Sequence, residues 1–120
     1  MVVDDDVGMI YTIKRGLEGT DEYEVTTVNS GVECINLLKH NKIPDLILLD
    51  IMIPEKNGLN TYNQLKDKDE WKNIPIMFLT TRTNRIAKEI NDFQGDDYIE
   101  KPFKVPELKG RIEKILKNNY

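Results

Sequence analysis

Apolar residues fall into two kinds of segment along this chain. Short runs such as Leu46–Leu49 and Ile76–Leu79 have no polar alternation, which is typical of strands covered on both faces, as in the interior of a parallel sheet. Elsewhere apolar residues recur at spacings of three and four, which predicts amphipathic helices. Strands are predicted at 1–3, 23–28, 46–49, 76–79 and 98–99. Helices are predicted from Val7, Ile10, Ile13 and Leu17; Val32, Ile35 and Leu38; Leu59, Tyr62 and Leu65; Ile86, Ile90 and Phe93; and Leu108, Ile112, Ile115 and Leu116.

Residues that start or stop helices support these bounds. The first helix is expected to begin beside Asp6 and to stop near Gly19. Ser30 can cap the second helix, which is expected to end before Pro44. The strand at 1–3 is short, and we interpret it as the end of a strand whose first residues are missing from this sequence.

The alternation of strands and helices predicts an α/β fold with a doubly wound sheet. Parallel strands need crossover connections, and right-handed crossover helices cover both faces of the sheet. We therefore expect five parallel strands and five helices in one domain, residues 1–120. In such sheets, ligands bind at the carboxyl ends of the strands.

Charge and composition exclude several classes of function. The net charge is −4, with 17 basic residues among 21 acidic ones, so direct nucleic-acid binding is not expected. No apolar run approaches the roughly 20 residues that cross a bilayer, and the first residues lack the basic-then-apolar pattern of a signal peptide, so we expect a cytoplasmic protein. Cys34 and His40 are alone of their kinds and cannot build a Cys/His zinc site. Cys34 is expected to pack on a helix face.

Polar side chains follow four of the predicted strands. Two carboxylates about 4 Å apart repel by about 4 kcal/mol at an effective dielectric constant of about 20, so a cluster of aspartates at one sheet edge needs cations. A lysine supplies one positive charge, and Mg²⁺ suits carboxylates, water and a phosphate oxygen. A carboxylate beside such an ion can attack phosphorus, which predicts phosphoryl transfer to an aspartate. The strand-end residues are Asp4, Asp5 and Asp6; Asp50; Thr80 and Thr81; and Lys101.

Four blocks of this sequence, in order and spanning nearly the whole chain, resemble response-regulator receiver domains, which have the CheY-like (flavodoxin-like) fold. The resemblance implies the strand order 2-1-3-4-5. Within this family, the chain is a candidate for the subtype found in winged-helix transcription regulators. The blocks are Val2-Val3-Asp4-Asp5, Leu46 to Pro54 with Asn57-Gly58, Ile74 to Thr80, and Asp97 to Phe103.

By this resemblance, Asp50 accepts a phosphoryl group from a phosphohistidine of a sensor histidine kinase or phosphotransfer protein, or from a small acyl phosphate. Asp50 and Asp5 would be direct ligands of Mg²⁺, with Mn²⁺ as an alternative ion. Asp4 would act mainly through a bound water, and the Met52 carbonyl would complete the protein's ligands. The chain would catalyse only its own phosphorylation and dephosphorylation.

The same resemblance implies a switch. Thr80 and Lys101 would contact the phosphoryl group, and Tyr98 would turn inward as Thr80 moves. The Lys101–Pro102 bond is usually cis in the family. Two departures affect this site: Thr81 stands where the family has Ala or Ser, and the segment before Tyr98 is one residue short.

A dimer face is also implied, if a one-residue gap is placed just after Gly95. The charged residues Lys88, Asp97, Glu107 and Arg111 then match positions on the fourth helix, fifth strand and fifth helix that pair across a symmetric homodimer in winged-helix regulators. The alternative is that they are solvated charges on amphipathic elements.

Two other functions remain open. One is a pseudo-receiver that acts only as a protein-interaction module, against which the retained acceptor and metal carboxylates argue. The other is a metal-dependent hydrolase with an aspartyl nucleophile, which needs a second acid or base that Ile51 and Met52 do not offer.

Overall fold

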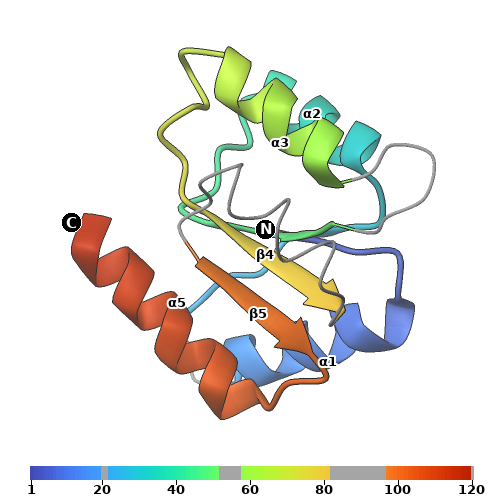
Figure 1. The fold of residues 1–120 in the computed structure, drawn as a ribbon, viewed down its shortest axis with the longest axis vertical. Coiled ribbons are helices and arrows are strands. Elements are labelled where there is room, and N and C mark those ends of the chain that lie inside the picture. The colour runs from blue at the N-terminus through green and yellow to red at the C-terminus, as the bar shows by residue number, and fades with distance from the viewer. Residues whose placement is uncertain (20–21, 52–57, 82–96, 120) are drawn as a thin grey trace.

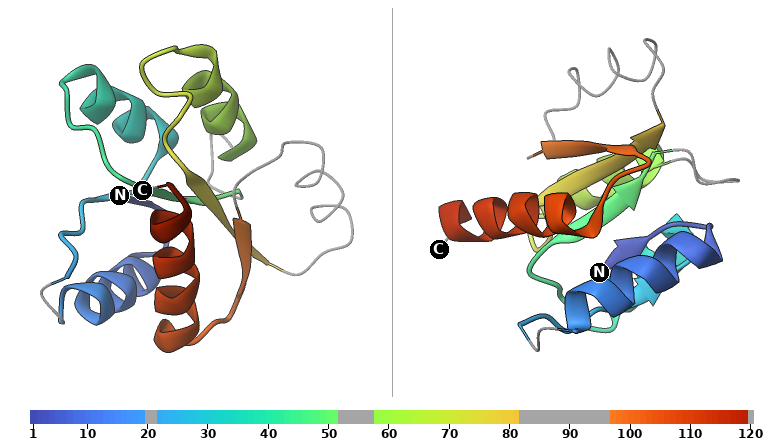
Figure 2. Two further views of the ribbon diagram at one scale, coloured as in Figure 1. Left: turned by 90° about the vertical axis from the view of Figure 1, so that its left-hand side faces the viewer. Right: turned by 90° about the horizontal axis from the view of Figure 1, so that it is seen from below.

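The computed structural model describes residues 1–19, 22–51, 58–81 and 97–119. A parallel sheet of five strands in the order β2-β1-β3-β4-β5 forms its centre, which confirms the predicted topology. Helices lie on both faces (Figures 1 and 2). The predicted helix of Ile86, Ile90 and Phe93 lies outside the described residues. The elements are β1 Val2–Val3, α1 Val7–Glu18, β2 Thr27–Val28, α2 Gly31–Lys39, β3 Ile47–Asp50, α3 Gly58–Asp67, β4 Ile76–Thr81, β5 Asp97–Lys101 and α5 Val105–Asn119.

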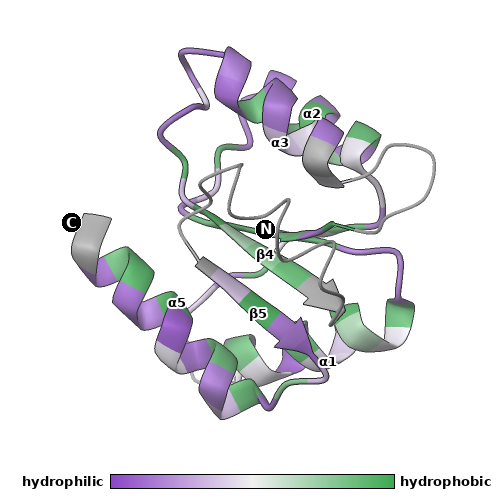
Figure 3. Ribbon diagram, in the orientation of Figure 1, coloured by the Kyte–Doolittle hydropathy of each residue, from purple (hydrophilic) through white to green (hydrophobic). Residues whose placement is uncertain are grey.

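The sheet separates two apolar clusters. Alternate side chains of a strand point to opposite faces, so each continuous run supplies both clusters. In β3, Ile47 and Leu49 pack toward α2 and α3, while Leu48 packs toward α1 and α5. Burial on both faces therefore explains why these strands read as unbroken apolar runs, as the hydropathy colouring in Figure 3 shows for β4.

The predicted helix starts are confirmed. The Asp6 carboxylate accepts a hydrogen bond from the Met9 amide (3.1 Å), and the Ser30 hydroxyl accepts one from the Glu33 amide (3.2 Å). Both caps satisfy amides that lack a partner in the first turn of a helix.

Two residues predicted to lie on apolar helix faces are instead exposed: the side chain of Val7 is 75% exposed and that of Val32 is 51% exposed. Each stands in the first turn of its helix. An apolar stripe is buried only along the part of the helix that lies over the sheet.

The second strand is shorter than predicted. β2 contains only Thr27 and Val28, so the prediction of a strand at 23–28 is wrong for 23–26. Its neighbour β1 begins at Val2, which pairs with Thr27. The backbone of a strand needs hydrogen-bond partners in a neighbouring strand along its whole length. Positions before Thr26 have no β1 residue opposite them.

Two further sequence expectations can be compared with the structure. The Lys101–Pro102 peptide bond is cis, as expected. Among the described residues, no helix is both long and apolar enough to cross a bilayer. The cytoplasmic location stays a prediction.

Cys34 is fully buried in α2, which confirms its predicted packing role. Burial raises the pKa of its thiol to about 11, and the positive N-terminus offsets only part of this rise. At pH 8 only about one Cys34 in a thousand is then a thiolate, the reactive form. We predict that Ellman's reagent leaves the native protein unlabelled over hours at pH 8 and labels one thiol at once in denaturant. Rapid labelling of the native protein would contradict this burial.

Candidate functional site

The carboxyl ends of β1, β3 and β5 bring three charged side chains together. Asp4 directly follows β1, Asp50 ends β3, and Lys101 ends β5. All strands are parallel, so these ends lie at one edge of the sheet. β4 and β5 can be followed side by side to this edge in Figure 1.

Lys101 joins the two buried carboxylates. Its Nζ lies 2.7 Å from Asp4 Oδ2 and 3.1 Å from Asp50 Oδ2. Asp4 is 0% exposed and Asp50 is 5% exposed. Buried carboxylates require a nearby countercharge or hydrogen-bond donors. The ammonium group of Lys101 supplies a positive charge and a hydrogen bond to each of these two carboxylates.

The charge on Lys101 is held firmly. Burial alone lowers the pKa of the ammonium, but the hydrogen bond to Asp4 and the negative charges of Asp50 and Asp4 outweigh it, so the pKa is raised. A raised pKa contributes stability that is fully present below the ordinary lysine value and is lost only as the pH rises through the folded-state value. Lys101 therefore keeps its positive charge throughout the neutral range.

A third carboxylate gives the cluster its capacity for a cation. Asp4, Asp5 and Asp50 each offer an oxygen, and these three oxygens lie within 4.8 Å of one another. Lys101 contacts two of these three carboxylates, so among the described residues the cluster carries excess negative charge. Oxygen ligands of this kind suit a hard divalent cation, and the donor set fits one.

The three carboxylates are not equivalent. Both oxygens of Asp4 have partners, since Oδ1 accepts from the Asp6 amide (3.0 Å) and Oδ2 from Lys101. Asp5 is exposed and lies on the outer side of the cluster. Asp5 is therefore better placed than Asp4 to bind a cation directly.

The other predicted site residues are placed less completely. Met52 and Lys88 lie outside the described residues, as do the side chains of Thr80 and Asp97. The backbone of Thr80 pairs with Glu100 across β4 and β5.

The predicted switch residue Tyr98 is 42% exposed. Its carbonyl accepts a hydrogen bond from Arg111 Nη1 (2.6 Å), and Arg111 also lies 3.8 Å from Glu107. Two of the predicted dimer-face residues thus contact each other within the chain.

Gly58 lies beside the site, although the sequence pattern assigned it no role of its own. Gly58 begins α3, and its amide donates to the Ile51 carbonyl (2.8 Å). A Cβ at Gly58 would stand against the Asp50 carbonyl oxygen and 2.6 Å from Ile51 Cα. The position of the Asp50 backbone therefore depends on the missing side chain, and only the place of Gly58 in the matched block signalled this.

Comparisons with known proteins agree with the fold. A family model described as the response regulator receiver domain matches residues 1–113. The response regulator MprA of Mycobacterium sp. (strain KMS) is 35% identical over 120 residues, which cover 98% of this chain and 50% of that protein. The chain spans about half the length of the curated relatives it matches.

Solved structures are similar throughout the chain. The signal receiver domain of a signal transduction histidine kinase from Syntrophus aciditrophicus has a TM-score of 0.89 and 29% identity, covering 98% of this chain and 88% of that one. The chemotaxis protein CheY4 of Vibrio cholerae has a TM-score of 0.80 and 26% identity, covering 94% of this chain and 93% of that one. These similarities confirm the expected fold family.

Proposed function

The chain belongs to the response-regulator receiver family of two-component signalling, and from this premise we propose that Asp50 is its phosphoacceptor. The observation that carries the proposal is the pairing of a nearly buried Asp50 with Lys101 beside two further carboxylates. This arrangement combines a nucleophilic oxygen, a fixed positive charge and a cation-binding edge at one point.

In the proposed reaction, a carboxylate oxygen of Asp50 attacks phosphorus in line with the leaving group. The new O–P bond forms as the bond breaks to the imidazole nitrogen of a phosphohistidine or to the acyl oxygen of a small acyl phosphate. Lys101 stabilises the charge on the transferring group. No general base is needed, because a carboxylate nucleophile has no proton to lose.

The cofactor in this proposal is Mg²⁺, or Mn²⁺ in its place. Asp5, Asp50 and the carbonyl of Met52 would hold it, with Asp4 acting through a water. The hydrogen bonds that occupy both oxygens of Asp4 support its indirect role. When bound, the ion supplies positive charge for the phosphoryl oxygens.

The partners remain proposals as well. A sensor histidine kinase or phosphotransfer protein would donate the phosphoryl group, and Thr80 with Tyr98 would transmit its arrival to the surface. Tyr98 is 42% exposed, so an inward turn on phosphorylation would bury surface that is now accessible to solvent. A homodimer through Lys88, Asp97, Glu107 and Arg111 is one output. The contact of Arg111 with Glu107 within the chain also fits the alternative of solvated charges.

Incubation with acetyl phosphate and Mg²⁺ tests the proposed function directly. We expect a mass gain of one phosphoryl group, located at Asp50 by peptide mapping after borohydride reduction. Asp50→Asn and an excess of EDTA should each abolish the gain. Asp69→Asn is the matched control, since Asp69 is 93% exposed and pairs with Lys72 in a surface contact.

Other outcomes of this experiment have a clear meaning. A protein that gains no mass in the presence of Mg²⁺ acts as a pseudo-receiver. Repeated turnover of a phosphate ester without accumulation of the phosphoprotein identifies a hydrolase. Either result overturns the proposal.

Asp5 gives a separate prediction about the cation. In EDTA, Asp5→Asn should raise the melting temperature by a few degrees, because it removes one member of a like-charged cluster. The wild type should gain about 2.7 kcal/mol of stability at a Mg²⁺ concentration 100-fold above its Kd, and the variant should lose most of this gain. Thermal melts with and without Mg²⁺ measure both effects. An undiminished Mg²⁺ response in the variant would exclude Asp5 as a ligand.

A further inference from the structure

A buried hydroxyl lies outside the cluster of Asp4, Asp50 and Lys101. The side chain of Thr61 in α3 is 0% exposed, and its Oγ1 has no hydrogen-bond partner among the described residues. A buried hydroxyl without a partner lowers the stability of a protein, and an apolar side chain of the same shape avoids that loss. The presence of threonine at this position therefore needs an explanation.

The Thr61 hydroxyl stands against Gly31, the first residue of α2. A Cβ at Gly31 would overlap the Thr61 oxygen and would lie 3.3 Å from Thr61 Cβ. α2 and α3 lie side by side on one face of the sheet (Figures 1 and 2). The two helices can approach this closely because residue 31 has no side chain.

The atom of Thr61 that faces Gly31 is an oxygen, and an oxygen fits closer than a methyl group. A Cα–H group and an oxygen make a favourable contact at about 3.3–3.6 Å, whereas two carbon atoms pack best at about 3.5–4.0 Å. A valine methyl in place of the hydroxyl would therefore push α3 away from α2 by roughly 0.3 Å. The hydroxyl allows the closer approach and lowers stability in return.

The position of α3 affects Asp50 because the first turn of α3 contacts the end of β3. Gly58 begins α3 three residues before Thr61, and its amide donates to the Ile51 carbonyl at 2.8 Å. A Cβ at Gly58 would stand against the Asp50 carbonyl oxygen. The first turn of α3 is thus enclosed between the backbone of Asp50 and Ile51 and the backbone of Gly31. A shift at Thr61 is transmitted to Asp50.

We propose that Thr61 is a positioning residue for the phosphorylation of Asp50. Its hydroxyl lets α3 lie close to α2, and this placement of α3 leaves the backbone of Asp50 undisturbed. The expected effect on the rate of phosphorylation rests on the proposed function of Asp50. The expected effect on the contact between Gly58 and Ile51 does not.

Two variants of Thr61 separate positioning from stability. With saturating acetyl phosphate and Mg²⁺, Thr61→Val should be phosphorylated at least threefold more slowly, and the Gly58 amide should exchange its hydrogen at least tenfold faster. Its melting temperature should be no lower than that of the wild type, because the unpartnered hydroxyl is gone. Thr61→Ser keeps the oxygen and should keep both the rate, within twofold, and the exchange of Gly58. It should melt at a lower temperature, because it loses a buried methyl group.

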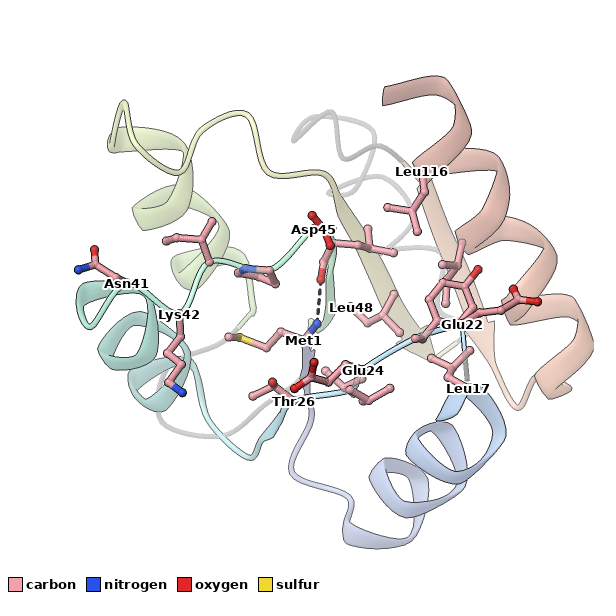
Figure 4. A pocket seen from close by; sticks show the side chains of 17 residues that line it. Met1, Leu17, Glu22, Glu24, Thr26, Asn41, Lys42, Asp45, Leu48 and Leu116 are labelled. Carbon is pink, nitrogen blue, oxygen red and sulfur yellow. Dashed lines mark hydrogen bonds between the residues drawn. The ribbon is translucent and has the colours of Figure 1, made fainter. Parts of the chain in front are cut away.

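Thr26→Val is the matched control, because it makes the same chemical change far from α3. Thr26 lines a cavity of about 440 Å³ beside Met1, at the other end of the strands (Figure 4). This variant should keep the wild-type rate and the wild-type exchange of Gly58.

A second pair of variants tests the contact from the side of α2. Gly31→Ala should slow phosphorylation at least fivefold, because its methyl group would overlap the Thr61 oxygen. Thr61→Ala in the same chain removes that oxygen and should recover most of the lost rate.

The inference has clear contrary results. A Thr61→Val protein with the wild-type rate and unchanged exchange at Gly58 would show that α3 does not respond to the group facing Gly31. Equal slowing in Thr61→Ser and Thr61→Val would show that packing of the methyl group, and not the hydroxyl, sets the rate. A wild type that accepts no phosphoryl group would overturn the proposed function and the expected effect on rate. The exchange of Gly58 would still decide whether Thr61 positions α3.

Discussion

Lys101→Met is expected to slow phosphorylation of Asp50 by acetyl phosphate by about a hundredfold or more, the cost of removing one positioned donor from a developing negative charge. In EDTA it should also lower the free energy of unfolding by about 3 kcal/mol, because it leaves the buried carboxylates of Asp4 and Asp50 without their common countercharge. Intact mass spectrometry measures the rate, and urea denaturation in EDTA measures the stability.

Lys72→Met is the matched control. Lys72 pairs with Asp69 at 3.2 Å, but the two side chains are 50% and 93% exposed, and surface pairs of this kind contribute 0.2–1 kcal/mol by rough estimate. We expect phosphorylation at the wild-type rate in this variant. A Lys101→Met protein as stable as the wild type in EDTA would show that Asp4 and Asp50 do not depend on this ammonium.

The fold could be predicted wherever a pattern of apolar residues is compatible with only one kind of burial. The runs Leu46–Leu49 and Ile76–Leu79 are apolar on both faces, and only a covered parallel strand accommodates such a run. The structure places them in β3 and β4 at the centre of the sheet. Segment 23–28 was different, because its strand depends on how far β1 extends beside it, and this property belongs to another part of the chain.

The site was predictable in its members but not in its contacts. Asp4, Asp50 and Lys101 were expected at one edge because parallel strands end together. The sequence offered Lys101 as a countercharge without indicating that its shorter contact is to Asp4, at 2.7 Å against 3.1 Å for Asp50. That distance depends on the relative positions of β1, β3 and β5, which no local pattern encodes.

These contacts link stability to the proposed chemistry. Lys101 bridges Asp4 and Asp50, so transfer of a phosphoryl group to Asp50, as proposed, would change the charge that Lys101 must balance. The position of Lys101 in β5, three residues after Tyr98, connects this change to the strand that carries the proposed switch residue. A surface that switches between two states on phosphorylation requires contacts, such as those of Lys101, that differ between the two states.

Gly58→Ala is expected to disturb the site more severely than any other single methyl group added to a described glycine. The new Cβ would meet backbone atoms, the Asp50 carbonyl oxygen and Ile51 Cα at 2.6 Å, and backbone cannot move aside as a side-chain end can. We expect the free energy of unfolding to fall by about 3 kcal/mol. Phosphorylation of Asp50 should slow at least tenfold even in the folded fraction, because the displaced backbone carries the proposed acceptor.

Gly110→Ala supplies the matched control, since both glycines lie in helices but a Cβ at Gly110 meets nothing within 4 Å. Helix propensity alone predicts that each alanine stabilises its helix by about 0.5–1 kcal/mol. The two substitutions should therefore change stability in opposite directions, and urea denaturation with phosphorylation rates distinguishes them. Two alanine variants that are both stabilised and both phosphorylated normally would show that α3 can shift away from Asp50, so that Gly58 does not determine the position of the acceptor.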